Sequence, residues 1–482
     1  MISYGPWAPD SPSYTPGICI EARNVLPGMG GYEPLRALVT TTNALDGPCL
    51  GAAAYLDDAG NAAVFAGTAA KLYRVPGATP DDVSKAGGYT GANWSFANSD
   101  GLVVATNYEQ PVQAYTLGAS ALFADLSADA PRARVAAFVG EFLMVGNTVD
   151  AIDGAKRARV WWSALADPTS WPAPGSTPAL AVQSDFQDLK GDGGEVRAII
   201  PGLANADAII LRERVTVRVN YVGSAAGVFD FRPIDGSRGT PFPNSAVEKN
   251  GRCFFVSDDG FYETDGVTVR ALGQGRVDRW FAGQIAGITA TALRAAVDPI
   301  RPLIWWVWPG RYVVYNWITE QFAWGDIDAS AVFSSYALST LVDDITDLVD
   351  DINIPVDDPV WSGNRRLTAF WTRDGRLATA SGENVECLIV SGDETPHGLR
   401  GGRITEVWPI TQAQVVECRV GFRDQMGPPV QYGGWSERTP PGFCAVNQRG
   451  RYFRFATRIA AGQTWRFLQG VDLAGVEEGA RG

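Results

Sequence analysis

Short apolar runs with a period of two dominate the chain. They are rich in β-branched and aromatic residues and are separated by turns of the D-G, N-G and G-x type, a pattern typical of β-strands joined by tight turns. The clearest strand covers 215–221, where Val215, Val217, Val219 and Tyr221 share one face. Helical periodicity is nearly absent, so the sequence predicts an all-β protein.

Seven segments repeat a plan of strands separated by turns, and their starts lie about 41 to 74 residues apart. They cover 52–75, 94–117, 135–165, 196–222, 246–272, 293–317 and 367–382. A period near 45 residues with three or four strands per unit is the signature of a β-propeller, whose blades stack around an axis. The unequal spacing predicts an irregular β-propeller and leaves its number of blades open.

The flanking segments differ from these units, so the sequence predicts three regions. Residues 1–48 form a Pro- and Gly-rich N-terminal lead-in with short strands, and residues 49–396 form the propeller, with an acidic insertion at 339–364. Residues 397–482 form a further C-terminal β-rich region, with its strongest hairpin at 451–471.

The charge balance excludes two classes of function. With 40 basic and 53 acidic residues the net charge is −13, whereas nonspecific DNA clamps and binders of anionic membranes need surplus Lys and Arg. The N-terminus has no signal-peptide pattern, and no apolar run approaches the roughly 20 residues of a transmembrane helix. We therefore expect a soluble chain made in a cytoplasm.

The residues that usually carry catalysis or bind metals are scarce. The only histidine is His397, which lies in a Gly- and Pro-rich stretch resembling a linker. The six cysteines form no C-x-x-C motif and are expected to be small buried apolar residues. No G-x-x-x-x-G-K-[ST] nucleotide loop is present. We expect no catalytic site, no cofactor and no required metal.

An acidic segment at 341–360 contains seven aspartates and no basic residue. They are Asp343, Asp344, Asp347, Asp350, Asp351, Asp357 and Asp358. Without a glycine for the turn of a Ca²⁺ loop, the segment fits either a solvated loop or helix, or a surface that repels polyanions. We expect it to face solvent, because unpaired carboxylates are costly to bury.

The C-terminal region reverses this balance. Residues 400–482 contain eleven Arg and no Lys against seven acids, a net charge of +4. On the strand 451–459, Phe453, Phe455 and Ile459 share one face. Arg and Tyr, enriched at binding hot spots, occupy the other. The candidate assembly interface therefore consists of Arg449, Arg451, Tyr452, Arg454 and Arg458, with a solvated strand face as the alternative.

Several of the 16 tryptophans are clustered, at 161–162, 305–308 and 317–324. In a propeller, tryptophan usually fills the space between blades. An exposed tryptophan funnel would instead favour a carbohydrate-binding receptor protein, and a pair of carboxylates could add glycosidase activity. This is the alternative function that the sequence leaves open.

Five segments, in order along most of the chain, resemble the tail hub and nozzle proteins of short-tailed phages. They are ARNVLPGMGGYEPLRAL (22–38), RVWWSALADPTSW (159–171), GRCFFVSDDGFYETDGVTVRALGQGRVDRWF (251–281), VVYNWITEQFAW (313–324) and RGRYFRFATRIAAGQTW (449–465). The family includes the packaged-DNA-stabilising tail proteins that close the neck below the portal. No catalytic motif is carried over.

The resemblance implies an irregular propeller in a homohexameric ring of the virion tail. It also implies contacts with adaptor or portal-side proteins and with tail fibres or spikes, and phage DNA passing through the centre of the ring without specific binding. A net-acidic wall suits such a path, because it would not grip DNA, and the acidic segment is a candidate for part of that wall.

Overall fold

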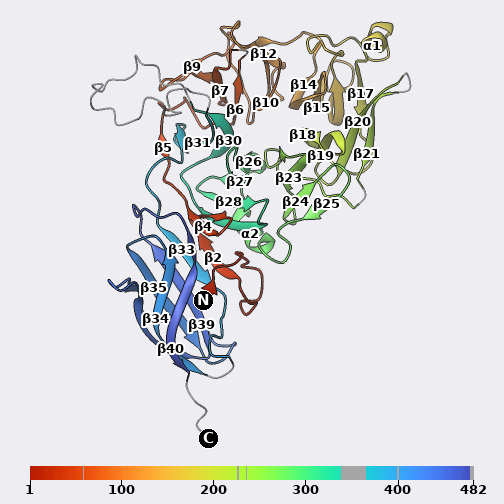
Figure 1. Cartoon of the computed structure of the whole chain (residues 1–482). Helices are drawn as coiled ribbons and strands as arrows, with labels where there is room; N and C mark the ends of the chain where they lie inside the picture. The colour runs from red at the N-terminus through yellow and green to blue at the C-terminus, as the bar shows by residue number, and fades with distance from the viewer. Residues whose placement is uncertain (58, 225–226, 235, 338–364, 399–400, 478–482) are drawn as a thin grey trace, which may run out of the picture.

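β-Strands are the main secondary structure of the described chain. The computed structural model describes residues 1–482 except 58, 225–226, 235, 338–364, 399–400 and 478–482 (Figure 1). Helices in this part of the chain are limited to α1 (Thr177–Ala181), α2 (Asp278–Ile285) and a single 3-10 turn, Ala290–Ala292. The prediction of an all-β protein is confirmed.

Five four-stranded blades follow one another along the chain. Blade one contains β6 (Gly51–Leu56), β7 (Ala62–Gly67), β8 (Leu72–Val75) and β9 (Asp81–Asp82). Blade two contains β10 (Ser95–Ser99), β11 (Leu102–Thr106), β12 (Gln113–Thr116) and β13 (Ala124–Asp125). Blade three contains β14 (Arg132–Val139), β15 (Phe142–Asp150), β16 (Gly154–Trp162) and β17 (Asp185–Asp188). Blade four contains β18 (Val196–Leu203), β19 (Ala206–Arg212), β20 (Thr216–Ser224) and β21 (Gly227–Pro233). Blade five contains β22 (Val247–Lys249), β23 (Arg252–Val256), β24 (Phe261–Thr264) and β25 (Val269–Ala271).

Two further blades complete the ring. Blade six contains β26 (Arg294–Val297), β27 (Leu303–Trp308), β28 (Arg311–Asn316) and β29 (Gln321–Asp326). Blade seven contains β30 (Ala331–Tyr336), β31 (Arg366–Trp371), β32 (Leu377–Thr379) and, from the N-terminal segment, β5 (Val39–Thr40). The innermost strands contact one another in the order β6, β10, β14, β18, β22, β26, β30 and back to β6. The described residues therefore form a closed, seven-bladed β-propeller.

The last blade differs from its predicted form. The seventh predicted unit begins at residue 367, but its innermost strand, β30, begins at Ala331. Its outermost strand is β5, which pairs antiparallel with β32 through Thr40 and Ala378. An N-terminal strand thus closes the ring, which a search for repeats along the sequence does not detect.

The C-terminal region forms a β-sandwich together with the start of the chain. One sheet contains β1 (Ile2–Ser3), β3 (Val25–Gly28), β4 (Gly31–Pro34), β40 (Leu468–Glu477), β34 (Gly402–Thr411) and β38 (Cys444–Gly450). The other contains β2 (Cys19–Arg23), β33 (Cys387–Ser391), β39 (Tyr452–Ile459), β35 (Val416–Arg423), β36 (Gln431–Tyr432) and β37 (Ser436–Glu437).

This arrangement shifts two predicted boundaries. Four strands of the lead-in belong to the sandwich, and the boundary predicted at 396/397 separates β33 from β34, which are both sandwich strands. The stretch around His397 therefore connects two strands of one domain instead of linking two domains. The first and last strands of the described chain, β1 and β40, pair with each other in this sandwich through Ile2 and Val471.

The propeller and the sandwich share one sheet and one core. β2 pairs with β29 of blade six through Arg23 and Trp324, so a ten-stranded sheet runs from one domain into the other. Trp7 packs against Trp280 and Trp324, with ring centroids 4.7 and 6.4 Å apart. Burial of such large rings stabilises the junction. The two domains therefore meet in a packed hydrophobic interface.

Candidate functional site

The predicted alternation on the arginine strand is present. Phe453, Phe455 and Ile459 of β39 are buried in the sandwich, whereas Arg454 and Arg458 are half-buried on the opposite face. Of the other predicted residues, Tyr452 shares this outer face, Arg451 is exposed just before β39, and Arg449 is exposed on β38. The two sides of the strand thus separate core packing from a polar surface.

Arg454 has an acidic partner within its own chain. Its Nε and Nη2 donate to the two oxygens of Asp393 at 2.9 and 3.0 Å. Arg423 donates to the same carboxylate at 2.6 Å, and Ser13 donates its hydroxyl. Burial alone would raise the pKa of Asp393, but the bonds from Arg454 and Ser13 and the two positive charges outweigh it, so the pKa lies below its ordinary value.

Arg458 also has a partner in its own sheet. Its Nε donates to Glu417 on the neighbouring strand β35 at 2.7 Å. Its guanidinium lies 4.6 Å from the Trp435 ring centroid, and Arg419 lies 4.5 and 4.4 Å from the centroids of Tyr432 and Trp435. Guanidinium groups stack favourably on aromatic rings in this way.

These side chains form one continuous surface, the arginine–aromatic face, consisting of Arg419, Tyr432, Trp435, Arg454 and Arg458. The sequence hypothesis missed the first three. The alternation of buried and polar positions in β35 could have identified Arg419, but nothing local predicts which strand lies beside β39. Two of the candidate interface arginines, Arg454 and Arg458, pair with carboxylates of their own chain.

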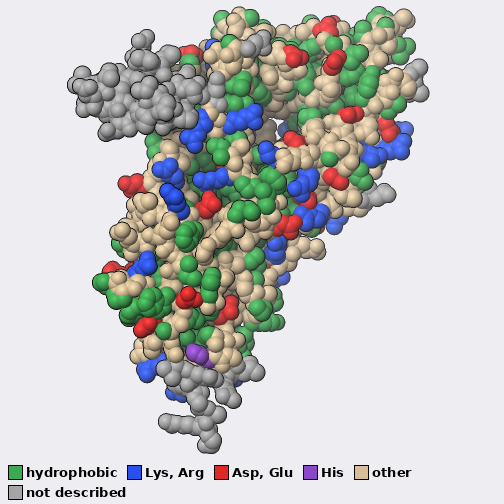
Figure 2. All heavy atoms as spheres, viewed as in Figure 1, with side chains coloured by type: hydrophobic (Ala, Val, Ile, Leu, Met, Phe, Trp, Pro, Cys, Tyr) green, Lys and Arg blue, Asp and Glu red, His purple; other side chains and the backbone are tan. Residues whose placement is uncertain are grey.

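The predicted acidic surface lies outside the described residues. All seven aspartates, Asp343, Asp344, Asp347, Asp350, Asp351, Asp357 and Asp358, belong to 338–364, which connects β30 to β31 in sequence. On the face drawn in Figure 2, basic and acidic side chains are interspersed.

Most described tryptophans pack inside the protein. Trp306 and Trp371 are fully buried, and among the tryptophans of the described chain only Trp408 reaches the exposed class, at 36%. Trp408 packs on Phe443 with centroids 5.2 Å apart, and its Nε1 donates to Glu406 at 3.1 Å. These residues therefore provide no funnel of exposed tryptophans for stacking sugars.

The propeller axis encloses a cavity of about 500 Å³. All seven innermost strands contribute to its wall, which is rich in alanine, as at Ala52, Ala136 and Ala295. Small side chains are needed there because seven strands converge on one axis. A DNA duplex, whose major groove alone is about 12 Å wide, has no room in a cavity of this size.

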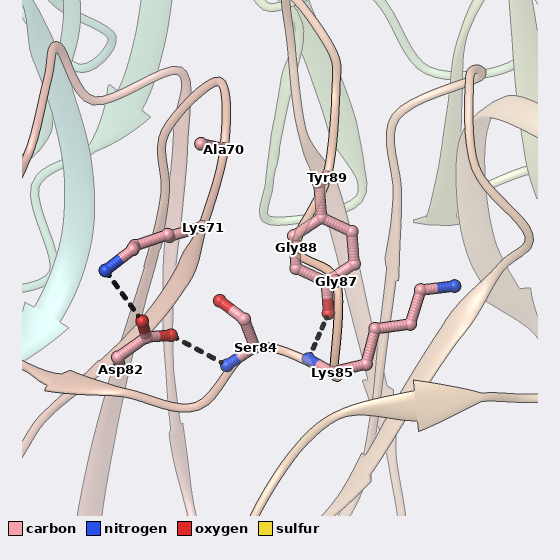
Figure 3. Close-up of a pocket in the computed structure, with 8 residues that line it drawn as sticks. All are labelled: Ala70, Lys71, Asp82, Ser84, Lys85, Gly87, Gly88 and Tyr89. Carbon is pink, nitrogen blue, oxygen red and sulfur yellow. Dashed lines mark hydrogen bonds and ion pairs between the residues drawn. The ribbon is translucent and has the colours of Figure 1, made fainter.

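A second cavity of about 520 Å³ lies at the outer part of blade one (Figure 3). Lys71 pairs with Asp82 at 2.8 Å, and Lys85 pairs with Asp125 at 2.6 Å. The backbone N–H of Lys85 donates to the Tyr89 hydroxyl at 3.1 Å. Both lysines of this cavity are therefore neutralised by carboxylates of the same chain.

The described residues have neither a metal-binding cluster nor a membrane-spanning helix. They contain no group of three or more His, Cys, Asp or Glu side chains placed to hold a metal ion. No helix among them has the length and apolar character needed to cross a membrane. All six cysteines are buried and unpaired, as expected.

The fold defines the chain as a seven-bladed β-propeller joined to a β-sandwich. No family model matches the sequence, and no curated protein matches it. Among solved structures, the chain is similar to BamB from Moraxella catarrhalis, with 10% sequence identity and a TM-score of 0.36. The match covers 74% of this chain and 92% of that chain.

Proposed function

We propose that this chain is a structural protein of a short phage tail. In this proposal it forms a closed homohexameric ring, a nozzle below the portal and its adaptor, that retains packaged DNA and lets it leave during ejection. The ring docks on portal-side proteins and carries tail fibres or spikes. In this proposal the protein has a structural role, as part of the ring and as a link between neighbouring tail proteins, and it catalyses no reaction.

The observation that carries the proposal is the ordered set of five segments that resemble phage tail hubs and nozzles. In the fold, four of the five, 22–38, 251–281, 313–324 and 449–465, contribute to one hydrophobic core at the junction of the propeller with the sandwich. They do so through Leu26, Phe261, Phe322 and Phe455, among others. The resemblance thus lies mainly in the part of the chain that fixes the two domains to each other.

A rigid junction between the propeller and the sandwich suits a protomer of a closed ring. Because the ten-stranded sheet and the shared core continue from blade six into the sandwich, each protomer can present two surfaces at a fixed angle. A heterologous contact repeated at a fixed angle closes into a ring when the rotation allows it. The arginine–aromatic face, together with Arg451, is the surface that we assign to such contacts.

The DNA path in this proposal lies between protomers. The cavity on the propeller axis is too narrow for a duplex, so DNA would pass along the common axis of the ring. The net charge of −13 per protomer supports a wall that slides along DNA without holding it.

Negative-stain imaging and native mass spectrometry of the purified protein test the proposal. Preparations with and without the adaptor ring of the same virion should be compared, because we expect the adaptor ring to template assembly. We expect closed six-fold rings on the adaptor. A single copy per particle, an open helical polymer, or isolated monomers in both preparations would contradict the proposal.

A further inference from the structure

One arginine at the propeller axis is buried without a carboxylate. Arg294 begins β26, lines the axial cavity and is 9% exposed. Its Nη2 donates to the backbone oxygen of Leu50 at 2.7 Å and to Asn93 Oδ1 at 3.2 Å. Neither partner is charged. Within the described chain, no acidic side chain lies within ion-pair distance of Arg294.

Two other arginines of the described chain, Arg159 and Arg212, are at least as deeply buried, and their donor nitrogens have partners. Arg159, whose side chain is 1% exposed, pairs with three aspartates, Asp150, Asp153 and Asp188. Arg212 uses Nε, Nη1 and Nη2 to donate to backbone oxygens between positions 190 and 194. In Arg294, by contrast, Nε and Nη1 have no hydrogen-bond partner among the described residues, although a guanidinium offers five N–H donors.

These free donors adjoin cavity space that an anion or water can occupy. Guanidinium stays protonated in proteins, and a buried positive charge favours an anionic partner over a neutral one. Burial lowers the pKa of Arg294, with only a weak opposing influence from Cys49. The free donors belong to a side chain that lines a cavity large enough for a small ligand.

Polar side chains gather at the end of the axis where Arg294 lies. Asn93 and Asn244 bond each other through their side-chain amides, and Asn244 also donates to the backbone oxygen of Thr291 at 2.9 Å. Leu50, Asn93, Asn244 and Arg294 each precede or begin an innermost strand, so they mark one end of the axis. Farther along, the side chains of the wall are mostly apolar, as at Ala136, Ile199 and Val332, and polar atoms lie between them.

We propose that the axial cavity binds a small organic monocarboxylate, with its carboxylate on Nε and Nη1 of Arg294 and its apolar body along the alanine-lined wall. A planar fork of two N–H groups matches a carboxylate in a bidentate pair. A single positive charge in an apolar wall favours one negative charge over two. This site does not depend on the proposed ring.

Calorimetric titration of the full chain with octanoate tests the site, with octanol as the uncharged probe. We expect saturable one-to-one binding of octanoate and affinity for octanol lower by about tenfold or more, since a charge-assisted bond is worth 1.5–3 kcal/mol or about a factor of ten and above. Arg294→Met should abolish this preference while keeping octanol binding. Arg301→Met, at an exposed arginine in the same blade, should bind octanoate as the wild type does.

A second variant keeps the test decisive if Arg294→Met does not fold, which circular dichroism would reveal. Ala295→Leu narrows the cavity and retains Arg294, and it should lose octanoate binding. The proposal is overturned if the wild type shows no saturable octanoate binding at about 1 mM. It is also overturned if the folded Arg294→Met or Ala295→Leu protein binds octanoate as tightly as the wild type.

Discussion

Asn93 and Asn244 stand 151 positions apart in the chain, and their side-chain amides bond each other at the propeller axis. Asn93 precedes the inner strand of blade two and Asn244 that of blade five. Because Arg294 of blade six donates to the same Asn93 oxygen, this pair ties blades on opposite sides of the ring.

The first prediction concerns the missing counter-charge at this point. Asn93→Asp places a carboxylate beside Arg294, and we expect it to stabilise the folded protein by about 1–3 kcal/mol at pH 7. The ion pair would hold the pKa of the new carboxyl down, so the gain is present above about pH 4 and is lost as the pH falls below it. Urea unfolding at pH 7 and pH 3 measures both effects.

Asn43→Asp, at an exposed asparagine, is the matched control and should change stability little. If Asn93→Asp destabilised the protein at pH 7 as strongly as Asn93→Ala, the lost bond to Asn244 would dominate, and the unpaired charge of Arg294 would be of little energetic consequence.

The second prediction concerns Asp393, whose side chain is 1% exposed and accepts bonds from Arg423 and Arg454. Asp393→Asn leaves two poorly exposed arginines without a counter-charge, so we expect a loss of about 3 kcal/mol in the free energy of unfolding. The pKa of Asp393 is lowered, so its stabilisation is present above about pH 4 and disappears as the pH falls further. Chemical denaturation across pH 3 to 7 is the measurement.

Asp328→Asn is the control for Asp393, because Asp328 and Arg373 form an ion pair that is 65% and 62% exposed. Exposed pairs contribute at most about 1 kcal/mol. Equal losses for the two variants would show that the Asp393 cluster acts as an ordinary surface pair.

The third prediction concerns the seam between β2 and β29. Burial raises the pKa of Glu21 to about 7, partly offset by the neighbouring indole N–H of Trp324 and the charge of Arg23. An acid with a raised folded pKa keeps its proton in the native state, so stability falls as the pH rises from about 4 to about 7. Glu21→Gln should remove this dependence. Thermal melts across this pH range measure the effect. Glu320→Gln, at an exposed ion pair, is the control and should keep the pH dependence of the wild type. If the stability of Glu21→Gln depended on pH as that of the wild type does, the prediction would be wrong.

The fourth prediction concerns closure of the ring by β5. The backbone N–H of Thr41 donates to the oxygen of Leu377 at 2.8 Å, and proline has no N–H to donate. Thr41→Pro should therefore loosen blade seven and speed amide exchange in β32, at a cost of about 1–3 kcal/mol. Thr41→Ala keeps the N–H and serves as the control. Unchanged exchange in β32 would show that β5 does not close the ring.

The fifth prediction tests the assembly surface without disturbing the Asp393 cluster. Arg454→Glu would remove one of the two positive charges that pair with Asp393 and so destabilise the protomer itself. Arg451 is exposed, so a substitution there tests the surface alone. Arg451→Glu should leave the melting temperature unchanged and block ring formation on the adaptor, as seen by negative-stain imaging. The control, Arg301→Glu on blade six, should assemble normally. Assembly of both variants would remove this surface from the proposed interface.

The alternation of apolar and polar positions alone determined much of the fold. It predicted the all-β class, the repeating units of a propeller and the two faces of β39, because side chains of a strand alternate with a period of two whatever the partner strand is. Within β20, Val217 and Val219 are buried as that pattern predicts, whereas Tyr221 of the same predicted face is exposed and Thr216 of the other is buried.

Only the tertiary structure decided which strands pair across long distances. β5 pairs with β32, more than 300 positions away, and so completes blade seven. The first strands of the chain complete the C-terminal sandwich. Arg454 forms an ion pair with Asp393 of its own chain. Blade number, the axial cavity and the unpaired charge of Arg294 depend on the same closure. A local pattern specifies which face of a strand is buried, but its partner is fixed only when seven blades and a shared core pack together at once.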